Sequence, residues 1–157
     1  MGKENLALRR ANAQDQTAVV ALVARLVEFG PPPWRDSDRM VEVDRERVIQ
    51  SLRSTQDDPA VFVATCGDRI AGFVHVHGLI DQYHTKPHGH IEDIVVAPEF
   101  EGRGVARLLL GVAERWAKEQ RFEWLTLSVF DQNSRARRIY EHVGFGSDIL
   151  RMVKPLS

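Results

Sequence analysis

The segment from Gly89 to Leu110 constrains the fold most, because it joins an acidic pair, an apolar strand, a short turn and a glycine-rich loop that opens a helix. The run of Ile and Val after the acidic pair predicts a buried strand over His90–Val96. Apolar residues then recur at intervals of three and four, which predicts an amphipathic helix over Gly102–Gln120. A strand followed so closely by such a helix indicates a sheet with helices packed on it.

Turn residues and periodicity divide the rest of the chain into further strands and helices. The run Gly30-Pro-Pro-Pro33 stops the first helix, since proline lacks an N–H donor and fixes φ. No repeat or linker interrupts the pattern, so we expect one domain over residues 1–157 with an α/β (α+β) fold. Strands are expected over Asn5–Arg10, Ala60–Thr65, Ile70–Gly78, Trp124–Phe130 and Gly144–Val153, and helices between Asp15 and Gly30, over Asp44–Ser54 and over Ser134–His142.

The charges of the chain nearly balance, with 21 basic and 22 acidic residues and a formal net charge of −1 at pH 7. Such a balance gives no global attraction to nucleic acid or to an anionic membrane, so neither is an expected partner. Cys66 is the only cysteine, which rules out an intrachain disulfide and is typical of the reducing cytoplasm. We therefore expect a cytoplasmic protein.

The loop Glu101–Ala106 lies between the expected strand and helix and contains Gly102 and Gly104. Glycines allow the backbone to approach a ligand closely, and the first N–H groups of a helix have no intrahelical partner. Together with the helix dipole, these groups form a site for a pyrophosphate. A strand-to-helix turn that is merely rich in glycine would have the same sequence. The loop is not of the Walker type, since no Gly-Lys-Ser/Thr follows.

A second motif, Asn133-x-x-Ala-x-x-x-Tyr140-x-x-x-Gly-Phe145, follows the strand expected after the long helix. Taken alone, Tyr140 would be interpreted as a core residue of an amphipathic helix. The order of the motifs changes that interpretation. Val96-x-Pro with Gly102-x-Gly-x-Ala, followed by the Asn-to-Phe motif, resembles the GCN5-related N-acetyltransferase (GNAT) superfamily over nearly the whole chain.

The resemblance implies a twisted mixed sheet whose central parallel strands, His90–Val96 and Trp124–Phe130, splay apart and admit acetyl-coenzyme A (acetyl-CoA). The chain departs from the family at Glu101, where Gln or Arg is usual. A carboxylate repels a pyrophosphate, so this departure bears on cofactor affinity, although Arg103 and Arg107 would offset part of the repulsion. The resemblance implies that the cofactor is bound by the backbone of Ile94, Val95 and Val96, by the loop residues Glu101, Gly102, Arg103, Gly104, Val105, Ala106 and Arg107, and by Asn133.

Acetyl transfer from a thioester to an amine needs a base for the ammonium proton, donors for the oxyanion and an acid for the leaving thiolate. Glu92 is the candidate base, directly or through water, and Tyr140 is the candidate acid. A backbone amide near Val96 is the candidate oxyanion donor. Neighbouring residues of a regular strand point to opposite faces, so Asp93 is assigned a structural or substrate-binding role. The alternative for the acid pair is a solvated strand end. Cys66 has no local His partner and is not expected to act as a nucleophile.

The acceptor side is expected to be lined by Trp34, Tyr83 and His90, with Asp93 as a further contact. No metal is expected, because the histidines of this region match no strong zinc signature. These histidines are His75, His77, His84, His88 and His90.

We expect the acceptor to be a primary amine of a small molecule such as a polyamine or an amino acid. Two alternatives remain. The strand Gly89–Val96 is also similar to that of glucosamine-6-phosphate N-acetyltransferases, and Arg35, Arg39 or Lys86 would then have to bind the phosphate. Glu101 instead favours a non-catalytic acyl-CoA-binding module on the same fold. Dimers are common in the family, so a homodimer is a further expectation.

Overall fold

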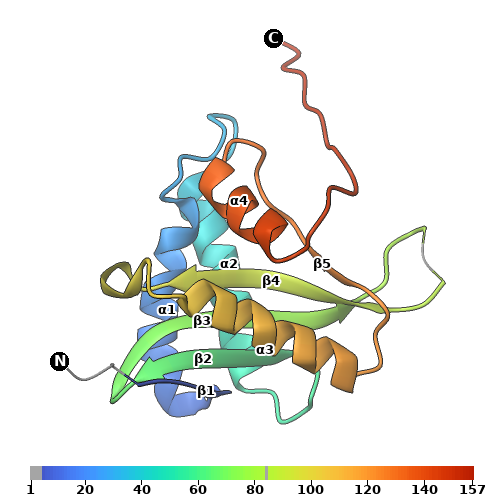
Figure 1. The fold of residues 1–157 in the computed structure, drawn as a ribbon. Coiled ribbons are helices and arrows are strands. Elements are labelled where there is room, and N and C mark those ends of the chain that lie inside the picture. Colours follow the sequence, from blue (N-terminus) through green and yellow to red (C-terminus); the bar gives the residue numbers. More distant parts are fainter. Residues whose placement is uncertain (1–4, 84) are drawn as a thin grey trace.

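The computed structural model describes residues 5–83 and 85–157 and shows a mixed sheet of five strands with helices on both faces (Figure 1). The mixed α/β fold expected from the sequence is confirmed. The strands are β1 (Leu6–Arg10), β2 (Ala60–Cys66), β3 (Arg69–Leu79), β4 (His88–Val96) and β5 (Leu125–Leu127); the helices are α1 (Gln16–Val23), α2 (Ser37–Leu52), α3 (Val105–Glu119) and α4 (Ser134–His142), with short 3-10 turns η1 (Ala13–Asp15), η2 (Ala24–Val27) and η3 (Pro98–Phe100).

The sheet has the order β1-β2-β3-β4-β5, and its β4–β5 pair is parallel while the other pairs are antiparallel. The parallel pair is short, because it begins with Gly89 opposite Leu125 and ends with Ile91 opposite Leu127. Beyond this point β4 continues while the chain after β5 leaves the sheet, so Glu92–Val96 keeps an edge that β5 does not cover. The two parallel strands therefore splay apart as the resemblance implied.

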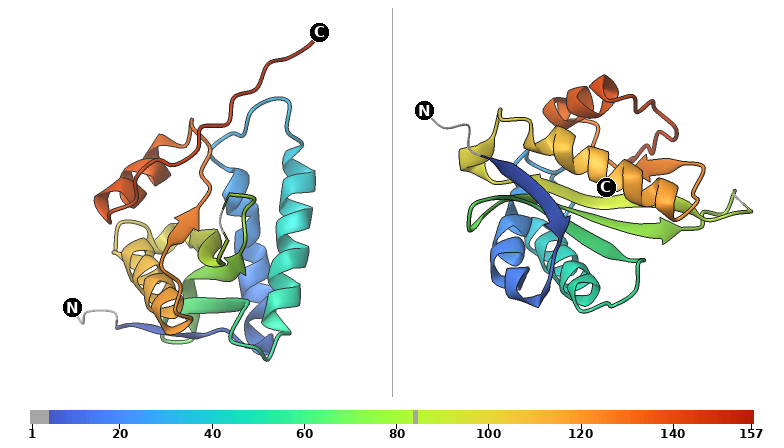
Figure 2. Two further views of the ribbon diagram at one scale, coloured as in Figure 1. Left: turned by 90° about the vertical axis from the view of Figure 1, so that its right-hand side faces the viewer. Right: turned by 60° about the horizontal axis from the view of Figure 1, so that its bottom comes forward.

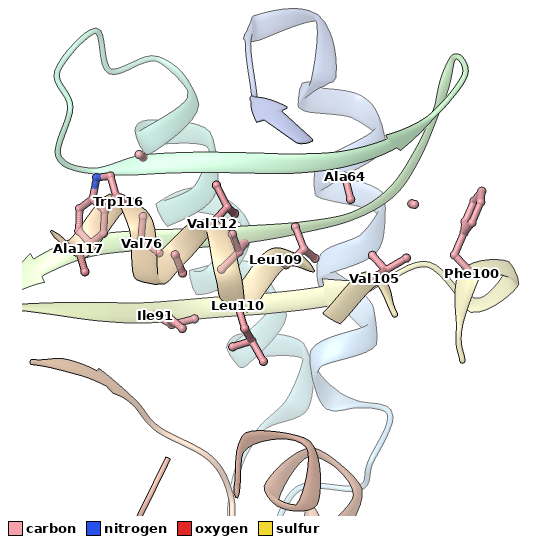
Figure 3. Close-up of a cluster of buried hydrophobic side chains, with 14 of the residues drawn as sticks. Ala64, Val76, Ile91, Phe100, Val105, Leu109, Leu110, Val112, Trp116 and Ala117 are labelled. Carbon is pink, nitrogen blue, oxygen red and sulfur yellow. The ribbon is translucent and has the colours of Figure 1, made fainter. Parts of the chain in front are cut away.

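Side chains alternate along the strands and form two hydrophobic cores, one on each face of the sheet. On one face Leu109 and Trp116 of α3 pack with Ile91 of β4 (Figure 3). On the other face Val48 of α2 packs with Phe73 of β3. The two views in Figure 2 show the sheet between these helix layers. Burying a side chain of this size contributes about 1.5–3 kcal/mol, so both helix layers hold β4 firmly in place.

Gly72 of β3 lies directly beneath α3. A Cβ atom at this position would stand 2.5 Å from the carbonyl oxygen of Val95 and 3.1 Å from Leu109. Since packed backbone cannot yield that far, we expect Gly72→Ala to lower the free energy of unfolding by about 1–3 kcal/mol. Gly111 is the matched control, because it is exposed on α3 and a Cβ there meets nothing within 4 Å. Gly111→Ala is expected to raise the free energy of unfolding by about 0.5–1 kcal/mol. Urea denaturation measures both, and an unchanged midpoint for Gly72→Ala would contradict the close approach of α3.

The strand expected over Gly144–Val153 is wrong. The segment after α4 forms no strand and runs away from the body of the protein (Figure 1). The alternation of apolar residues suits a strand, but a strand needs a neighbour with which to share hydrogen bonds, and this tail pairs with none of the described strands. Five large apolar side chains consequently stay exposed, namely Ile149, Leu150, Met152, Val153 and Leu156.

The bounds of two other elements differ from those expected from the sequence, each for a local reason. The helix α2 begins at Ser37 instead of Asp44, because Asp36 caps it by accepting a hydrogen bond from the backbone N–H of Arg39. The strand expected over Trp124–Phe130 shrinks to the three residues of β5, which pair with Gly89, His90 and Ile91 of β4. Among the described helices, none has the length and apolar content that crossing a bilayer requires.

Candidate active site

β4 contains a bulge at Glu92. Its pairing with β3 shifts at this point: His75 lies opposite Asp93, whereas Val76 lies opposite Ile91, so Glu92 has no partner of its own. The extra residue turns Glu92 toward α2, the same side that Asp93 faces. Regular alternation would have placed the two carboxylates on opposite faces. The expectation drawn from that alternation is therefore wrong, because the strand is irregular at this residue.

The Glu92 carboxylate is held between a helix and a strand. Its Oε1 accepts a hydrogen bond from Arg47 of α2 at 2.5 Å, and its Oε2 lies 2.7 Å from Nε2 of His77 on β3. The hydrogen bond to His77, helped by the charge of Arg47 and opposed by burial, lowers the pKa of Glu92 to about 2. The same hydrogen bond raises the pKa of His77 above its ordinary value. Glu92 is therefore ionised at physiological pH, and His77 is the group of the pair that takes up a proton.

His90 faces the same carboxylate from two residues earlier on β4. Its Nε2 lies 3.9 Å from Oε2 of Glu92, and its Nδ1 lies 2.8 Å from the hydroxyl of Thr126 on β5. Burial lowers the pKa of His90 to about 4, so its ring is neutral at physiological pH. The rings of His77 and His90 are 5.4 Å apart between centroids. The structure thus brings His90 and Glu92 together and adds His77, while the role of His90 as an acceptor contact stays a prediction.

Asp93 lies in a buried layer behind this group and is 5% exposed. Its Oδ2 is 3.2 Å from Nδ1 of His75, whose Nε2 is 2.7 Å from the hydroxyl of Ser51 on α2. Of the two roles that the sequence left open for Asp93, this placement favours the structural one. Asp44 of α2 belongs to the same layer, because burial and the charge of Asp93 raise the pKa of Asp44 to about 6.

The sequence does not indicate that α2 contributes polar side chains to the site. Asp44, Arg47 and Ser51 recur at intervals of three and four, which places them on one helix face. That periodicity was visible, but α2 was expected to begin only at Asp44, and nothing local connected its polar face to β4. The sequence predicts no partner for His77, which is named there only among the histidines of this region.

The glycine loop ends in an N-terminus suited to an anion. Gly102 and Gly104 have φ values of 74° and 80°, a region that glycine adopts without strain. Gly104 is the N-cap of α3, and no side chain among the described residues caps that end. The first N–H groups of α3 are therefore available to a ligand, with Arg103 and Arg107 adjacent in the sequence. The helix starts at Val105 instead of Gly102 because these left-handed glycines precede it.

Glu101 is paired with two arginines from other elements. One of its oxygens accepts a hydrogen bond from Arg25 at 2.6 Å, and the other lies 3.4 Å from Arg135 of α4. The hydrogen bond to Arg25 and the charge of Arg135 lower the pKa of Glu101. The repulsion expected between this carboxylate and a pyrophosphate is therefore offset by Arg25 and Arg135, two residues that the sequence did not connect to the loop.

Ile94, Val95 and Val96 lie on the part of β4 that β5 leaves open. Their side chains pack into the two cores, Val95 on one face and the other two on the opposite face. The backbone edge is what this stretch offers to a ligand, as addition of an extended group to a strand requires. Arg25 donates a hydrogen bond to the carbonyl oxygen of Val96, so the guanidinium that pairs with Glu101 also reaches this edge.

The helix α4 holds the two residues expected from the second motif. Asn133 is its N-cap, and its side-chain oxygen accepts a hydrogen bond from the N–H of Ala136 at 3.3 Å. Tyr140 packs against the core beneath α3, with its ring edge-on to Phe145 at 6.1 Å. Burial raises the pKa of Tyr140 to about 12, so the phenol stays protonated at physiological pH.

Trp34 and Tyr83 are exposed, at 54% and 78% of their surfaces. The guanidinium of Arg35 stacks on the Trp34 ring at 4.3 Å. Within the described ranges, neither aromatic side chain is hydrogen-bonded to Glu92. The structure does not join them to the polar cluster, and they stay predictions as acceptor contacts. His84 lies outside the described residues.

A cavity of about 400 Å³ opens between α3, β5 and the end of α4. Arg107, Leu110, Leu125 and Phe145 are among its lining residues. It adjoins the helix that follows the glycine loop and does not include Glu92. The polar cluster on the α2 side and this cavity thus lie on opposite faces of the sheet.

Comparison with known proteins assigns the family. A model described as the acetyltransferase (GNAT) family matches residues 21–145. The chain belongs to this family, and it is an acetyl-CoA-dependent N-acetyltransferase.

Several known proteins are similar to this chain in sequence or in fold. The aminoalkylphosphonate N-acetyltransferase of Salmonella typhimurium is 25% identical over 151 residues, which cover 95% of this chain and 90% of that protein. A type 1 aminoglycoside N(6')-acetyltransferase of Stenotrophomonas maltophilia is 31% identical over 90 residues, covering 55% of each chain. Among solved structures, the aminoglycoside N-acetyltransferase AAC(6')-Iy in complex with CoA superposes with a TM-score of 0.73 at 19% identity, over 99% of this chain and 98% of that chain.

Proposed function

We propose that the enzyme transfers the acetyl group of acetyl-CoA directly to a primary amine of a small molecule, with Glu92 as the base and Tyr140 as the acid. The polar cluster around Glu92 carries the proposal, because it adjoins the open edge of β4 where the pantetheine arm would add as an extra strand. The N-terminus of α3 would then bind the pyrophosphate, and Asn133 would contact the coenzyme arm.

Proton removal in this cluster involves two groups. A carboxylate with a pKa of about 2 is a weak base on its own. His77 is in direct contact with that carboxylate, and its Nδ1 is 2.8 Å from the carbonyl oxygen of Gly78. We assign Glu92 the role of accepting the ammonium proton through a water molecule, with His77 sharing the proton. Because Glu92 is half-buried, its negative charge attracts a cationic amine more strongly than an exposed carboxylate would.

The charges around Glu92 favour an acceptor that is itself a cation. The carboxylates of Glu92 and Asp93 lie close enough to Asp44 to raise the pKa of Asp44, and Arg47 opposes them. Curated relatives named as acetyltransferases of aminoglycosides and aminoalkylphosphonates both act on small amines, which supports the same class of acceptor here. Glu101 was the feature that favoured a non-catalytic acyl-CoA-binding module. Its negative charge is balanced by ion pairs with Arg25 and Arg135, so it no longer supports that alternative.

An amine panel tests this function. The purified enzyme is mixed with acetyl-CoA and, separately, polyamines, amino acids, aminoglycosides, aminoalkylphosphonates and glucosamine 6-phosphate. Release of the free thiol and the mass of the acetylated product are measured. We expect turnover with at least one cationic amine. Tight binding of acetyl-CoA without turnover of any amine would overturn the catalytic proposal. Turnover of glucosamine 6-phosphate alone would replace it with the amino-sugar alternative.

Glu101 provides a prediction about cofactor affinity. Replacing it with glutamine frees Arg25 and Arg135 from a competing carboxylate, so acetyl-CoA should bind about 2- to 5-fold more tightly at low ionic strength. The gain should vanish at about 0.5 M salt, where exposed charges are screened. Glu99→Gln is the matched control, because Glu99 is exposed and hydrogen-bonded to Arg69. Isothermal titration calorimetry gives both affinities, and weaker binding by Glu101→Gln would show that the carboxylate helps to hold the cofactor.

A further inference from the structure

Three side chains around the bulge converge on one point. One ring nitrogen each of His77 and His90 and a carboxylate oxygen of Glu92 all lie within 4.8 Å of one another. The sheet register creates this group, because His77 lies opposite His90 across the β3–β4 pair and Glu92 is two residues further along β4. The spacing in the sequence does not reveal it, since the residues come from two strands.

Nδ1 of each histidine lies within hydrogen-bond distance of a group other than Glu92. Nδ1 of His77 lies 2.8 Å from the carbonyl oxygen of Gly78, which can only accept, so this nitrogen bears the hydrogen. Nδ1 of His90 lies 2.8 Å from the Thr126 hydroxyl, and that hydroxyl lies 3.4 Å from the carbonyl oxygen of Gly89. When the hydroxyl donates to Gly89, Nδ1 of His90 bears the hydrogen and its Nε2 carries the lone pair. In that tautomer the Nε2 atoms of both neutral rings carry lone pairs, and both lie near Oε2 of Glu92.

Three lone-pair donors arranged in this way favour a cation between them. At His77 and Glu92 a single proton can fill that role, but it leaves the lone pair of His90 unused. Arg47 binds the other oxygen of Glu92, so the oxygen in this group stays directed at the histidines. We propose that His77, His90 and Glu92 form a binding site for one divalent transition-metal ion of the Zn²⁺ class.

The donor set and its surroundings fit such an ion. Two imidazoles and one carboxylate are ligands that Zn²⁺ and Co²⁺ accept in proteins, and the second nitrogen of each ligating histidine is usually fixed by a hydrogen bond, as here. Metal–ligand bonds of about 2.0–2.2 Å in a tetrahedron need donors about 3.3 Å apart. The present separations of 2.7 Å for His77 and 3.9 Å for His90 from the Glu92 oxygen bracket that value. A fourth position remains for water.

Metal binding and proton abstraction compete for the same oxygen of Glu92. A bound ion would occupy the lone pairs that accept the ammonium proton, so Zn²⁺ should inhibit acetyl transfer. This consequence rests on the proposed function, whereas binding of the ion does not. Measurements of binding without acetyl-CoA or amine therefore separate a failure of the site from a failure of the catalytic proposal.

The test uses the full-length protein, freed of any affinity tag. Zn²⁺ is titrated calorimetrically, and Co²⁺ is titrated while its visible absorption is recorded. The variants are His77→Gln, His90→Gln and Thr126→Val, and His142→Gln on the exposed end of α4 is the matched control. We expect one ion per chain, a Co²⁺ spectrum typical of a four- or five-coordinate site, and affinity at least about 10-fold weaker in each of the first three variants. Circular dichroism verifies that each variant is folded.

The outcomes decide the proposal. Unchanged affinity in His142→Gln together with weakened affinity in the two histidine variants supports the site, and weakening in Thr126→Val supports the fixed orientation of His90. No 1:1 binding below about 100 µM, or equal affinity in wild type and both histidine variants, would overturn it. Binding without inhibition of acetyl transfer would leave the metal site standing and overturn the role of Glu92 as the base.

Discussion

Glu92→Gln is expected to lower kcat/KM for the acceptor amine by about 10²- to 10⁴-fold while leaving the affinity for acetyl-CoA unchanged. The amide keeps the shape of the side chain but removes its charge and its ability to take up a proton. It also ends the ion pairs with His77 and Arg47, although the amide oxygen can still accept a hydrogen bond from Arg47. Steady-state kinetics with the best amine of the panel, combined with calorimetry of acetyl-CoA binding, measures both effects.

Glu123→Gln is the matched control for this substitution. Glu123 is exposed, precedes β5 in the sequence, and pairs with Lys86 at 3.6 Å. Its kcat/KM should equal that of the wild type. Full activity in Glu92→Gln would remove Glu92 from the base role, and a loss of acetyl-CoA binding would show that the cluster supports the cofactor site.

Tyr140→Phe is expected to lower kcat by about 10²-fold or more, because only the hydroxyl that would protonate the leaving thiolate is removed. The partly buried phenol has a pKa of about 12 and is a proton donor throughout the physiological range. Its edge-on contact with Phe145 does not involve the hydroxyl, so the variant should fold normally and bind acetyl-CoA with wild-type affinity. Single-turnover rates, thermal melting and calorimetry provide the three readouts.

Two results would contradict the assignment of Tyr140. A variant as active as the wild type would show that another group or water protonates the thiolate. A fall in activity that is matched by weaker acetyl-CoA binding would instead assign Tyr140 to cofactor packing, the role that an amphipathic core residue would have.

The sequence predicts the fold correctly where the structure of a segment depends on its own residues. The apolar periodicity of α3 and the glycines before it predict a helix with a buried face and an open N-terminus. Both signals are local, because a helix buries one apolar face and glycine is the residue that most easily adopts a positive φ. The pairing of strands that are distant in the sequence is harder to predict. The tail after Gly144 has the pattern of a strand, but no strand of the sheet accepts it, and the short β5 reflects the same dependence on a partner.

The candidate site depended even more on contacts between distant segments. Glu92 could be selected from the sequence through the resemblance, but the bulge that turns it toward Asp93 and α2 is a property of the β3–β4 register. His77 became a partner of Glu92 only through that register. Arg25 neutralises Glu101 across 76 residues of chain, which no local pattern indicates. Side chains whose role depends on a neighbour in space need the fold before they can be assigned.

The central claim is direct transfer of the acetyl group from bound acetyl-CoA to an amine, and a single-turnover experiment with excess enzyme tests it most directly. The enzyme is first mixed with acetyl-CoA alone, and the masses of the protein and the cofactor are recorded before and after the best amine is added. We predict an unmodified protein and intact acetyl-CoA until the amine arrives, then one free thiol for each acetylated amine. An acetylated protein before amine addition, at Cys66 or elsewhere, would contradict the account.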